Sequence, residues 1–188
     1  MSPIQSHKGK LVVRHSSMAP SPYLKSLSPF LKDIRSFCLS HNKMATAVDV
    51  GCGNGRNSTA LMGMGYEVIS FDRQPDYGYP IELGEKEMPI FNGSANIVLL
   101  QYILMFLKDD GSGTAPIYRV IQQAFDMCGY PGAIVVELCP VKNSLYSAAE
   151  LDKIQADIIK MAHGCGWREY RAKRFHFTVT NRFSPDPS

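Results

Sequence analysis

A glycine-rich turn is the part of the sequence whose residue types and spacing could do chemistry. The turn follows an apolar run at residues 45–50 and consists of Gly51, Cys52, Gly53, Asn54 and Gly55. Glycines let the backbone turn tightly and approach a ligand without an intervening Cβ atom. Asp49 stands before the turn, and Asp72 follows 21 residues after Gly51. This arrangement is typical of a loop that binds a small ligand between a strand and a helix.

Two classes of ligand compete for this loop, and a merely tight turn is the third interpretation. Dinucleotides prefer the spacing G-x-G-x-x-G, which leaves backbone amides free for a pyrophosphate. Here the spacing is G-x-G-x-G, and Asp49 lies two residues before the first glycine. An acid at that place suits a cation, and S-adenosylmethionine (SAM) carries an ammonium and a sulfonium but no phosphate. We therefore favour SAM over a nicotinamide or flavin dinucleotide, with Asp72 accepting the ribose hydroxyls.

The elements that must position this loop follow an alternating pattern. The segments 45–50, 66–71, 97–100 and 133–138 are expected as buried strands, and the segments 57–64, 115–128 and 148–163 as helices. Ser147 and Glu150 predict a capping box at the start of the last helix, and Gly129 is expected to stop the helix before it. Apolar strands that alternate with amphipathic helices predict an α/β, Rossmann-like, doubly wound and mostly parallel sheet, with helices on both faces. The strands expected at 167–174 and 175–180 have no helix between them. They should form an antiparallel hairpin at the C-terminal edge of the sheet.

Length and composition predict one globular domain. The 188 residues carry a net charge of +3, with 45% hydrophobic and 20% charged residues, which excludes a mostly disordered chain. We place the domain at residues 28–183, beginning with a helix that Ser28 caps, that has Pro29 at its first position and that ends near Ser40. Residues 1–27 are expected as a mobile arm or an active-site flap, and residues 184–188 as a tail.

Cysteine usage and hydropathy indicate the cellular compartment in which the protein works. The five cysteines are scattered and never spaced C-x-x-C, so neither a disulfide framework nor a metal site is expected. The longest apolar stretch, residues 95–107, is far shorter than the roughly 20 residues that span a bilayer. A cytoplasmic protein that does not bind membranes is the resulting prediction.

The sequence resembles the class I SAM-dependent methyltransferases and, more narrowly, the tellurite-resistance methyltransferases. The matching segments are 49–57, 71–72, 104–107 and 130–132, so the resemblance extends over about residues 45–140. It implies SAM as cofactor and S-adenosylhomocysteine as product. The residues that it places around the cofactor are Asp49, Gly51, Cys52, Gly53, Asn54, Gly55, Asn57, Asp72, Arg73, Glu85, Met88 and Gln101.

One segment departs from the family pattern. Family members usually have a full helix and a third strand between the residues equivalent to Asp72 and Ile97. Only 24 residues intervene here, and they include prolines and glycines. That segment is too short for both elements, so the adenine side is expected to be open or covered by the N-terminal arm.

The sequence signals for residues that bind the methyl acceptor are less specific than those for the cofactor. Methyl transfer mainly needs alignment of donor and acceptor, and a base only if the acceptor arrives protonated. Tyr102 and His15 are the candidate catalytic residues, and Tyr23, Tyr102 and Glu137 are the candidate acceptor-binding residues. For each of these the alternative is structural, since exposed histidines and buried tyrosines are common.

Three functions remain open. The first is a small-molecule methyltransferase with a soft acceptor such as a thiol or a selenium or tellurium oxyanion. Residues 100–103 carry neither of the strings typical of nucleic-acid base methyltransferases. The second is an RNA or protein methyltransferase that docks through a basic hairpin containing Arg168, Arg171, Lys173, Arg174 and Arg182; the alternative interpretation is a solvated edge strand. The third is a non-catalytic SAM-binding partner subunit.

Overall fold

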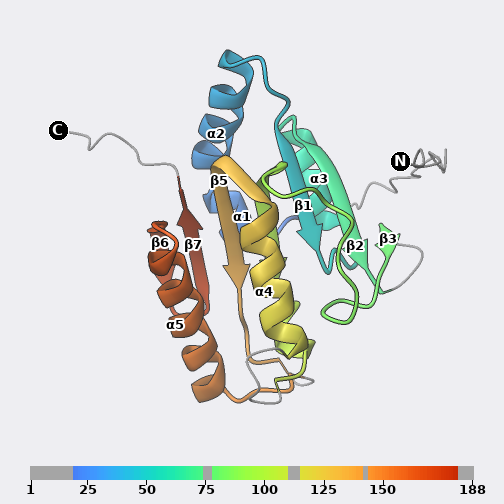
Figure 1. Ribbon diagram of the computed structural model, residues 1–188, viewed down its shortest axis with the longest axis vertical. Coiled ribbons are helices and arrows are strands. Elements are labelled where there is room, and N and C mark those ends of the chain that lie inside the picture. Colours follow the sequence, from blue (N-terminus) through green and yellow to red (C-terminus); the bar gives the residue numbers. More distant parts are fainter. Residues whose placement is uncertain (1–18, 74–77, 110–114, 142–143, 182–188) are drawn as a thin grey trace.

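The computed structural model describes residues 19–73, 78–109, 115–141 and 144–181 (Figure 1). These residues form a seven-stranded sheet with the order β3-β2-β1-β4-β5-β7-β6. The strands are β1 (Thr46–Val50), β2 (Glu67–Asp72), β3 (Tyr79–Pro80), β4 (Ala95–Gln101), β5 (Cys128–Glu137), β6 (Arg168–Lys173) and β7 (His176–Thr180). Neighbouring strands from β3 to β5 pair in parallel, and β7 pairs antiparallel with both β5 and β6. The mostly parallel sheet with an antiparallel C-terminal hairpin is therefore confirmed.

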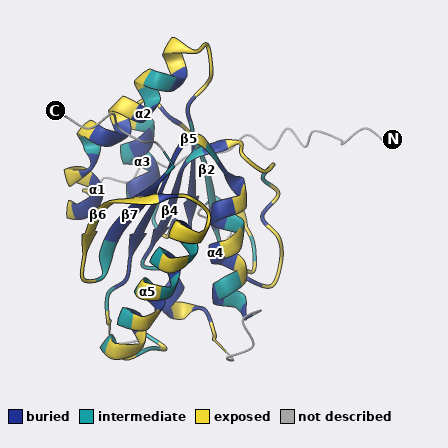
Figure 2. Ribbon diagram, turned by 60° about the vertical axis from the view of Figure 1, so that its left-hand side comes forward, coloured by how far each residue is buried: buried dark blue, intermediate teal, exposed yellow. Residues whose placement is uncertain are grey.

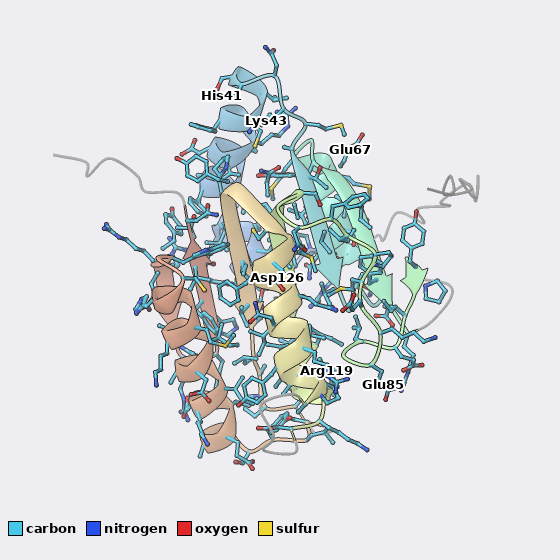
Figure 3. All side chains as sticks on the ribbon, in the orientation of Figure 1. His41, Lys43, Glu67, Glu85, Arg119 and Asp126 are labelled. Atoms are coloured by element: carbon cyan, nitrogen blue, oxygen red, sulfur yellow. The ribbon has the colours of Figure 1, made fainter. Side chains whose placement is uncertain are left out.

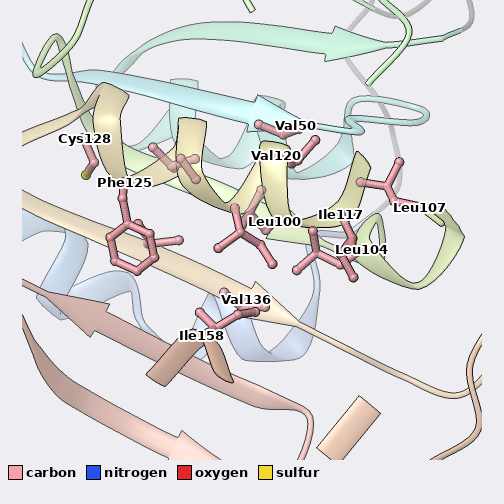
Figure 4. Close-up of a cluster of buried hydrophobic side chains, with 14 of the residues drawn as sticks. Val50, Leu100, Leu104, Leu107, Ile117, Val120, Phe125, Cys128, Val136 and Ile158 are labelled. Atoms are coloured by element: carbon pink, nitrogen blue, oxygen red, sulfur yellow. The ribbon is translucent and has the colours of Figure 1, made fainter. Parts of the chain in front are cut away.

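Helices cover both faces of this sheet, as expected. They are α1 (Pro22–Ser26), α2 (Ser28–Ser40), α3 (Arg56–Gly63), α4 (Pro116–Met127) and α5 (Ala148–Gly164). One buried cluster joins α1, α2 and α3 to side chains such as Ile97 and Val135. The other joins α4 and α5 to the alternate positions, such as Leu100 and Val136 (Figures 2 and 4). Strands with both faces buried must be apolar throughout, which explains their continuous apolar runs.

Local sequence signals set the helix ends, with two corrections. Ser147 and Glu150 form the expected capping box at the start of α5. Helix α2 spans the expected residues, but its N-cap is Leu27 rather than Ser28, because α1 ends immediately before it. Gly129 was expected to stop α4, but the helix ends two residues earlier and β5 begins at Cys128. A Cβ atom on Gly129 would lie 2.1 Å from the carbonyl oxygen of Gly93, so this glycine permits a close approach of two backbones.

The last residues of the expected N-terminal arm are part of the packed structure. Tyr23, Leu24 and Leu27 are buried against the sheet, and Ser21 caps α1 by accepting a hydrogen bond from the backbone N–H of Leu24. Residues 1–18, which include the candidate His15, lie outside the described residues. Residues 21–27 thus pack against the sheet in this structure, while most of the segment expected as a mobile arm or active-site flap lies outside the described residues.

The segment between β2 and β4 is reduced, as its length predicted. Its described residues, 78–94, contain one two-residue strand, β3, and no helix. Tyr79 pairs with Phe71 and Pro80 with Asp72, so β3 extends the sheet beside the end of β2. In the part of the chain that is described, no helix combines the length and apolar character needed to cross a membrane.

Candidate active site

A pocket of about 780 Å³ opens at the carboxyl ends of the central strands. It lies where the strand order reverses between β1 and β4, which is the usual ligand site of an open α/β sheet. One side is formed by the glycine loop, the start of α3 and the end of β2. The other is formed by the end of β4, the 3₁₀ turn Leu104–Phe106 and the start of α4. Residues far apart in the sequence thus meet at one edge of the sheet.

The glycine loop has backbone angles that explain its composition. Gly51, Gly53 and Gly55 have φ values of +72°, +51° and +73°, in the left-handed region that favours glycine. A Cβ atom on Gly51 would lie 2.6 Å from the Ile103 side chain, whereas a Cβ atom on Gly53 would meet nothing within 4 Å. Gly51 is therefore required by packing, and Gly53 leaves open space on the pocket side of the loop.

Asp72 stands at the end of β2 and faces this loop. Its Oδ2 atom accepts a hydrogen bond of 2.9 Å from the backbone N–H of Gly53. The carboxylate lines the pocket together with Arg73, Glu82 and Glu85. The carboxylates of Asp72, Glu82 and Glu85 are suited to binding ligand hydroxyls or a positively charged ligand.

Asp49 lies beneath the loop and does not line the pocket. It is buried, and the hydroxyl of Ser58 donates a hydrogen bond to its Oδ2 atom. Burial raises the pKa of the Asp49 carboxyl to about 6, against the weaker lowering effect of the Ser58 hydrogen bonds. Burial also raises the pKa of the nearby Cys52 thiol to about 12, which makes this pocket-lining cysteine an inert thiol.

Most of the expected cofactor residues come together. Those that line the pocket are Gly51, Cys52, Gly53, Asn54, Asn57 and, on the other strands, Asp72, Arg73, Glu85 and Gln101. Gly55 and Asp49 lie just outside the lining, as N-cap of α3 and as the buried acid of β1. Met88 is packed in the hydrophobic core rather than in the lining. Figure 3 shows Glu85 at the same end of the molecule as Arg119 of α4, whose guanidinium donates to the Gly84 carbonyl.

Tyr102 is the central residue of the pocket side that is formed by the end of β4. It follows β4 with a φ of +58°, an uncommon backbone conformation for a side chain of this size. The Arg56 guanidinium carbon lies 5.9 Å from the centre of its ring. Burial raises the pKa of the Tyr102 phenol, and the nearby Glu137 carboxylate raises it further. Tyr102 is therefore a neutral hydrogen-bonding group in the pocket wall, next to Gln101 and Ile103.

Glu137 and Tyr23, the other two candidate acceptor-binding residues, lie behind the pocket wall. Glu137 is fully buried at the end of β5 and does not line the pocket. Tyr23 is buried on α1; its hydroxyl lies 2.9 Å from that of Thr178, and burial raises the pKa of its phenol. Both residues lie with His176 and Ser21 in one polar group, beneath the side of the pocket that is formed by the end of β4. Neither Tyr23 nor Glu137 is placed to contact an acceptor directly, because neither residue lines the pocket.

Sequence reasoning did not single out several lining residues. These are Arg56, Glu82, Leu83, Ile103, Phe106, Leu107, Lys108 and Pro116. Arg56, Phe106 and Leu107 stand inside the motif segments, so their position in the family match was an available signal. Lys108 and Glu82 lie in irregular segments, where no periodicity indicates which way a side chain points. Ser21 and His176 reach the site only through tertiary packing.

The C-terminal hairpin packs most of its aromatic residues against the domain, although Tyr170 stays 46% exposed. Trp167 and Phe177 are buried, and Tyr170 stacks on Phe30 with ring centres 3.7 Å apart. Arg174 forms a two-pronged hydrogen-bonded pair with Asp152. Basic side chains remain exposed on β6, but the aromatic residues that would stack on bases are largely committed to packing.

Comparisons with known proteins agree with this geometry. Residues 37–87, which contain the glycine loop and Asp72, match the family model described as tellurite resistance protein TehB. A SAM-dependent methyltransferase from Archaeoglobus fulgidus has a similar structure, with 15% identity, 79% of this chain and 75% of that chain covered, and a TM-score of 0.50. No curated protein sequence matches the chain.

Two further solved structures share the fold. The 1,6-didemethyltoxoflavin-N1-methyltransferase from Burkholderia thailandensis, with S-adenosylhomocysteine bound, has 15% identity and a TM-score of 0.50, covering 85% of this chain and 76% of that chain. WbdD has 13% identity and a TM-score of 0.57, covering 82% of this chain and 40% of that chain. The family match over residues 37–87 agrees with the resemblance to the tellurite-resistance methyltransferases, and the solved structures show that the chain has the fold of the SAM-dependent methyltransferases.

Proposed function

We propose that this protein transfers a methyl group from SAM to a small-molecule acceptor. The observation that carries the proposal is the pocket in which the open glycine loop and the Asp72 carboxylate face the polar wall at Gln101 and Tyr102. SAM supplies a sulfonium-bound methyl group that a nucleophile displaces in line. The chain's own task is to hold the donor and the acceptor in line and to exclude water.

The residues on the glycine-loop side fit SAM. A volume of about 780 Å³ is within the usual range for small-ligand pockets. The space beside Gly53, which a Cβ atom would fill, allows close approach of a ligand to the backbone. Asp72 would accept the ribose hydroxyls, and Arg73 and Glu85 would lie beside the adenine. The buried Asp49 would favour a positive charge above it, since a nearby cation stabilises the ionised carboxylate.

Several features support a small acceptor over a macromolecule. The acceptor wall, with Tyr102, Ile103 and Phe106, lies inside the same pocket as the glycine loop. The hairpin that would dock RNA has committed most of its aromatic side chains to packing. The family match favours a soft nucleophile such as a thiol or a selenium or tellurium oxyanion as the first acceptors to test. The shortened segment before β4 motivates the remaining alternative, a SAM-binding subunit that needs a partner for catalysis.

Calorimetric titration with SAM, S-adenosylhomocysteine and NAD in parallel tests the cofactor. We expect micromolar binding of the first two ligands and none of NAD. Labelled SAM is then incubated with a thiol, selenite, tellurite and total RNA. Label in a small-molecule product supports the proposal, and label in RNA favours the docking alternative. Cofactor binding without any transfer favours the partner-subunit alternative, and failure to bind SAM contradicts all three.

A further inference from the structure

The chain enters the folded domain at the edge of the pocket. The backbone N–H of Ser21 donates a hydrogen bond to the side-chain oxygen of Asn57, and Nε2 of Gln101 donates one to the Ser21 hydroxyl; both bonds are 3.0 Å long. Asn57 and Gln101 line the pocket from α3 and β4. The part of the chain that precedes Ser21 therefore starts beside the pocket.

One part of the pocket mouth is acidic. The carboxylates of Asp72, Glu82 and Glu85 line it, with Arg73 as the cation next to Asp72. Glu82 and Glu85 are exposed, and neither forms an ion pair among the described residues. The described residues 78–94 contain no helix that would cover them. Carboxylates gathered at an open mouth attract a positively charged segment.

Another part of the mouth is apolar. Phe106 lines the pocket and is 45% exposed, and Leu145 is 55% exposed. The backbone N–H of Leu145 donates to the carbonyl of Met105, so Leu145 lies beside the 3₁₀ turn that carries Phe106. Large apolar side chains that adjoin on the surface, bordered by charged groups, are typical of a surface that another segment covers.

Residues 8–15 have the composition that complements this mouth. Lys8, Lys10 and Arg14 flank the apolar run at 11–13, and residues 1–20 contain no Asp or Glu. Extended chain spans about 3.3 Å per residue, so Arg14 can lie up to about 23 Å from Ser21, and Lys8 up to about 43 Å. A small domain is about 30 Å across. The segment is therefore long enough to reach every part of the mouth.

We propose that residues 8–15 close over the pocket mouth when the cofactor is bound, with the cationic side chains against Glu82 and Glu85 and the apolar run against Phe106. The inference rests on the proposed function and adds a cover to it. A bound cofactor fills the middle of the pocket and gives the apolar run a floor on which to lie. The cover excludes water from the methyl transfer, on the side that the described fold leaves open.

Hydrogen–deuterium exchange of the full-length chain, followed by mass spectrometry, tests the proposal. Peptides that contain residues 8–15 are compared without ligand and with saturating S-adenosylhomocysteine. We expect exchange in this segment to slow about tenfold when the ligand is bound. Raising the salt concentration to about 1 M should reduce the slowing, because salt screens the pairing of exposed charges.

Two matched variants test the charges. Lys8→Glu/Lys10→Glu brings like charges to Glu82 and Glu85 and should remove the slowing. Lys32→Glu/Lys160→Glu makes the same change in net charge at exposed positions of α2 and α5 and should retain it. S-adenosylhomocysteine should dissociate about tenfold faster from the first variant than from the wild type, because the cover is lost. Dissociation from the control variant should keep the wild-type rate.

The outcomes separate the cover from the proposed function. Equal exchange in residues 8–15 with and without bound S-adenosylhomocysteine overturns the inference and leaves the proposed function intact. Equal slowing in the two variants contradicts the pairing with Glu82 and Glu85 and overturns the inference as well. If S-adenosylhomocysteine itself does not bind, the proposed function fails and the inference fails with it.

Discussion

The two sides of the pocket are built in different ways. The glycine-loop side depends on backbone conformation within one short segment, residues 49–57, with Asp72 added from the neighbouring strand. The other side, at the end of β4, is the acceptor side in the proposed function. It depends on side chains from segments far apart in the chain, such as Ser21, Gln101 and Glu137. A site made by local backbone geometry leaves a readable motif, whereas a site made by strand register does not. The same contrast predicts how each side responds to substitution.

Gly51→Ala should have the largest effect. A left-handed φ costs a non-glycine residue about 1–2 kcal/mol, and the new Cβ atom would overlap Ile103 at 2.6 Å, adding about 1–3 kcal/mol. We expect the free energy of unfolding to fall by about 2–5 kcal/mol, measured by urea denaturation. The loop would move, so SAM binding should be lost as well.

Gly53→Ala is the matched control on the same loop. It bears only the backbone cost of about 1–2 kcal/mol, because its Cβ atom would meet nothing within 4 Å. SAM affinity should nevertheless fall at least tenfold, since the methyl group would occupy space beside the pocket. Equal stability losses for the two variants would contradict the assignment of Gly51 to packing and Gly53 to ligand approach.

The buried Asp49 should make stability depend on pH. Its pKa of about 6 in the folded protein exceeds the ordinary value of 3.8, so the folded state binds a proton that the unfolded state releases between these values. This group therefore lowers the free energy of unfolding by about 3 kcal/mol as pH rises from about 4 to 6. Asp49→Asn should remove that decrease, measured as the difference from wild type in urea denaturation at several pH values. Parallel curves for the two proteins would contradict the raised pKa of the buried Asp49 carboxyl.

Asp72→Ala tests the ribose contact from the neighbouring strand. Loss of hydrogen bonds to a charged acceptor should weaken SAM binding by about 1–3 kcal/mol in calorimetry. Asp126→Ala on α4, where the carboxylate accepts a hydrogen bond from the exposed Gln122 side chain, serves as the control and should leave the affinity unchanged. An unchanged affinity in Asp72→Ala would place the ribose elsewhere in the pocket.

The fold was predictable because its signals are local or periodic. Continuous apolar runs identified the central strands, and the capping box at Ser147 and Glu150 identified the start of α5. The glycine spacing and Asp72 identified one side of the pocket. Element ends were less accurate where tertiary contact decides them, as at Gly129, whose close approach to Gly93 could not be read from the sequence.

The acceptor side was only partly predictable for a physical reason. Gln101, Tyr102 and Glu137 were identified by their places at strand ends, but which of them faces the pocket depends on strand register and on the cover of α1. The family resemblance placed the backbone near Met88 beside the cofactor, yet the Met88 side chain packs into the core. Nothing in the sequence indicated that Ser21 lies behind the pocket, since its partners there, Asn57, Gln101 and Glu137, are 36 to 116 residues away.

Ser21→Ala should have a modest effect on stability and the smallest effect on SAM binding. It removes the cap of α1 and the hydrogen bonds of its hydroxyl with Glu137 and Gln101, and we expect the free energy of unfolding to fall by about 1–2 kcal/mol. Ser26→Ala, at the exposed end of the same helix, is the control for a lost serine hydroxyl. SAM affinity should remain at the wild-type value, because the glycine-loop side does not depend on this cap. If SAM affinity falls together with stability, the two sides of the pocket are energetically coupled through the backbone N–H of Ser21, which donates to Asn57 at the start of α3.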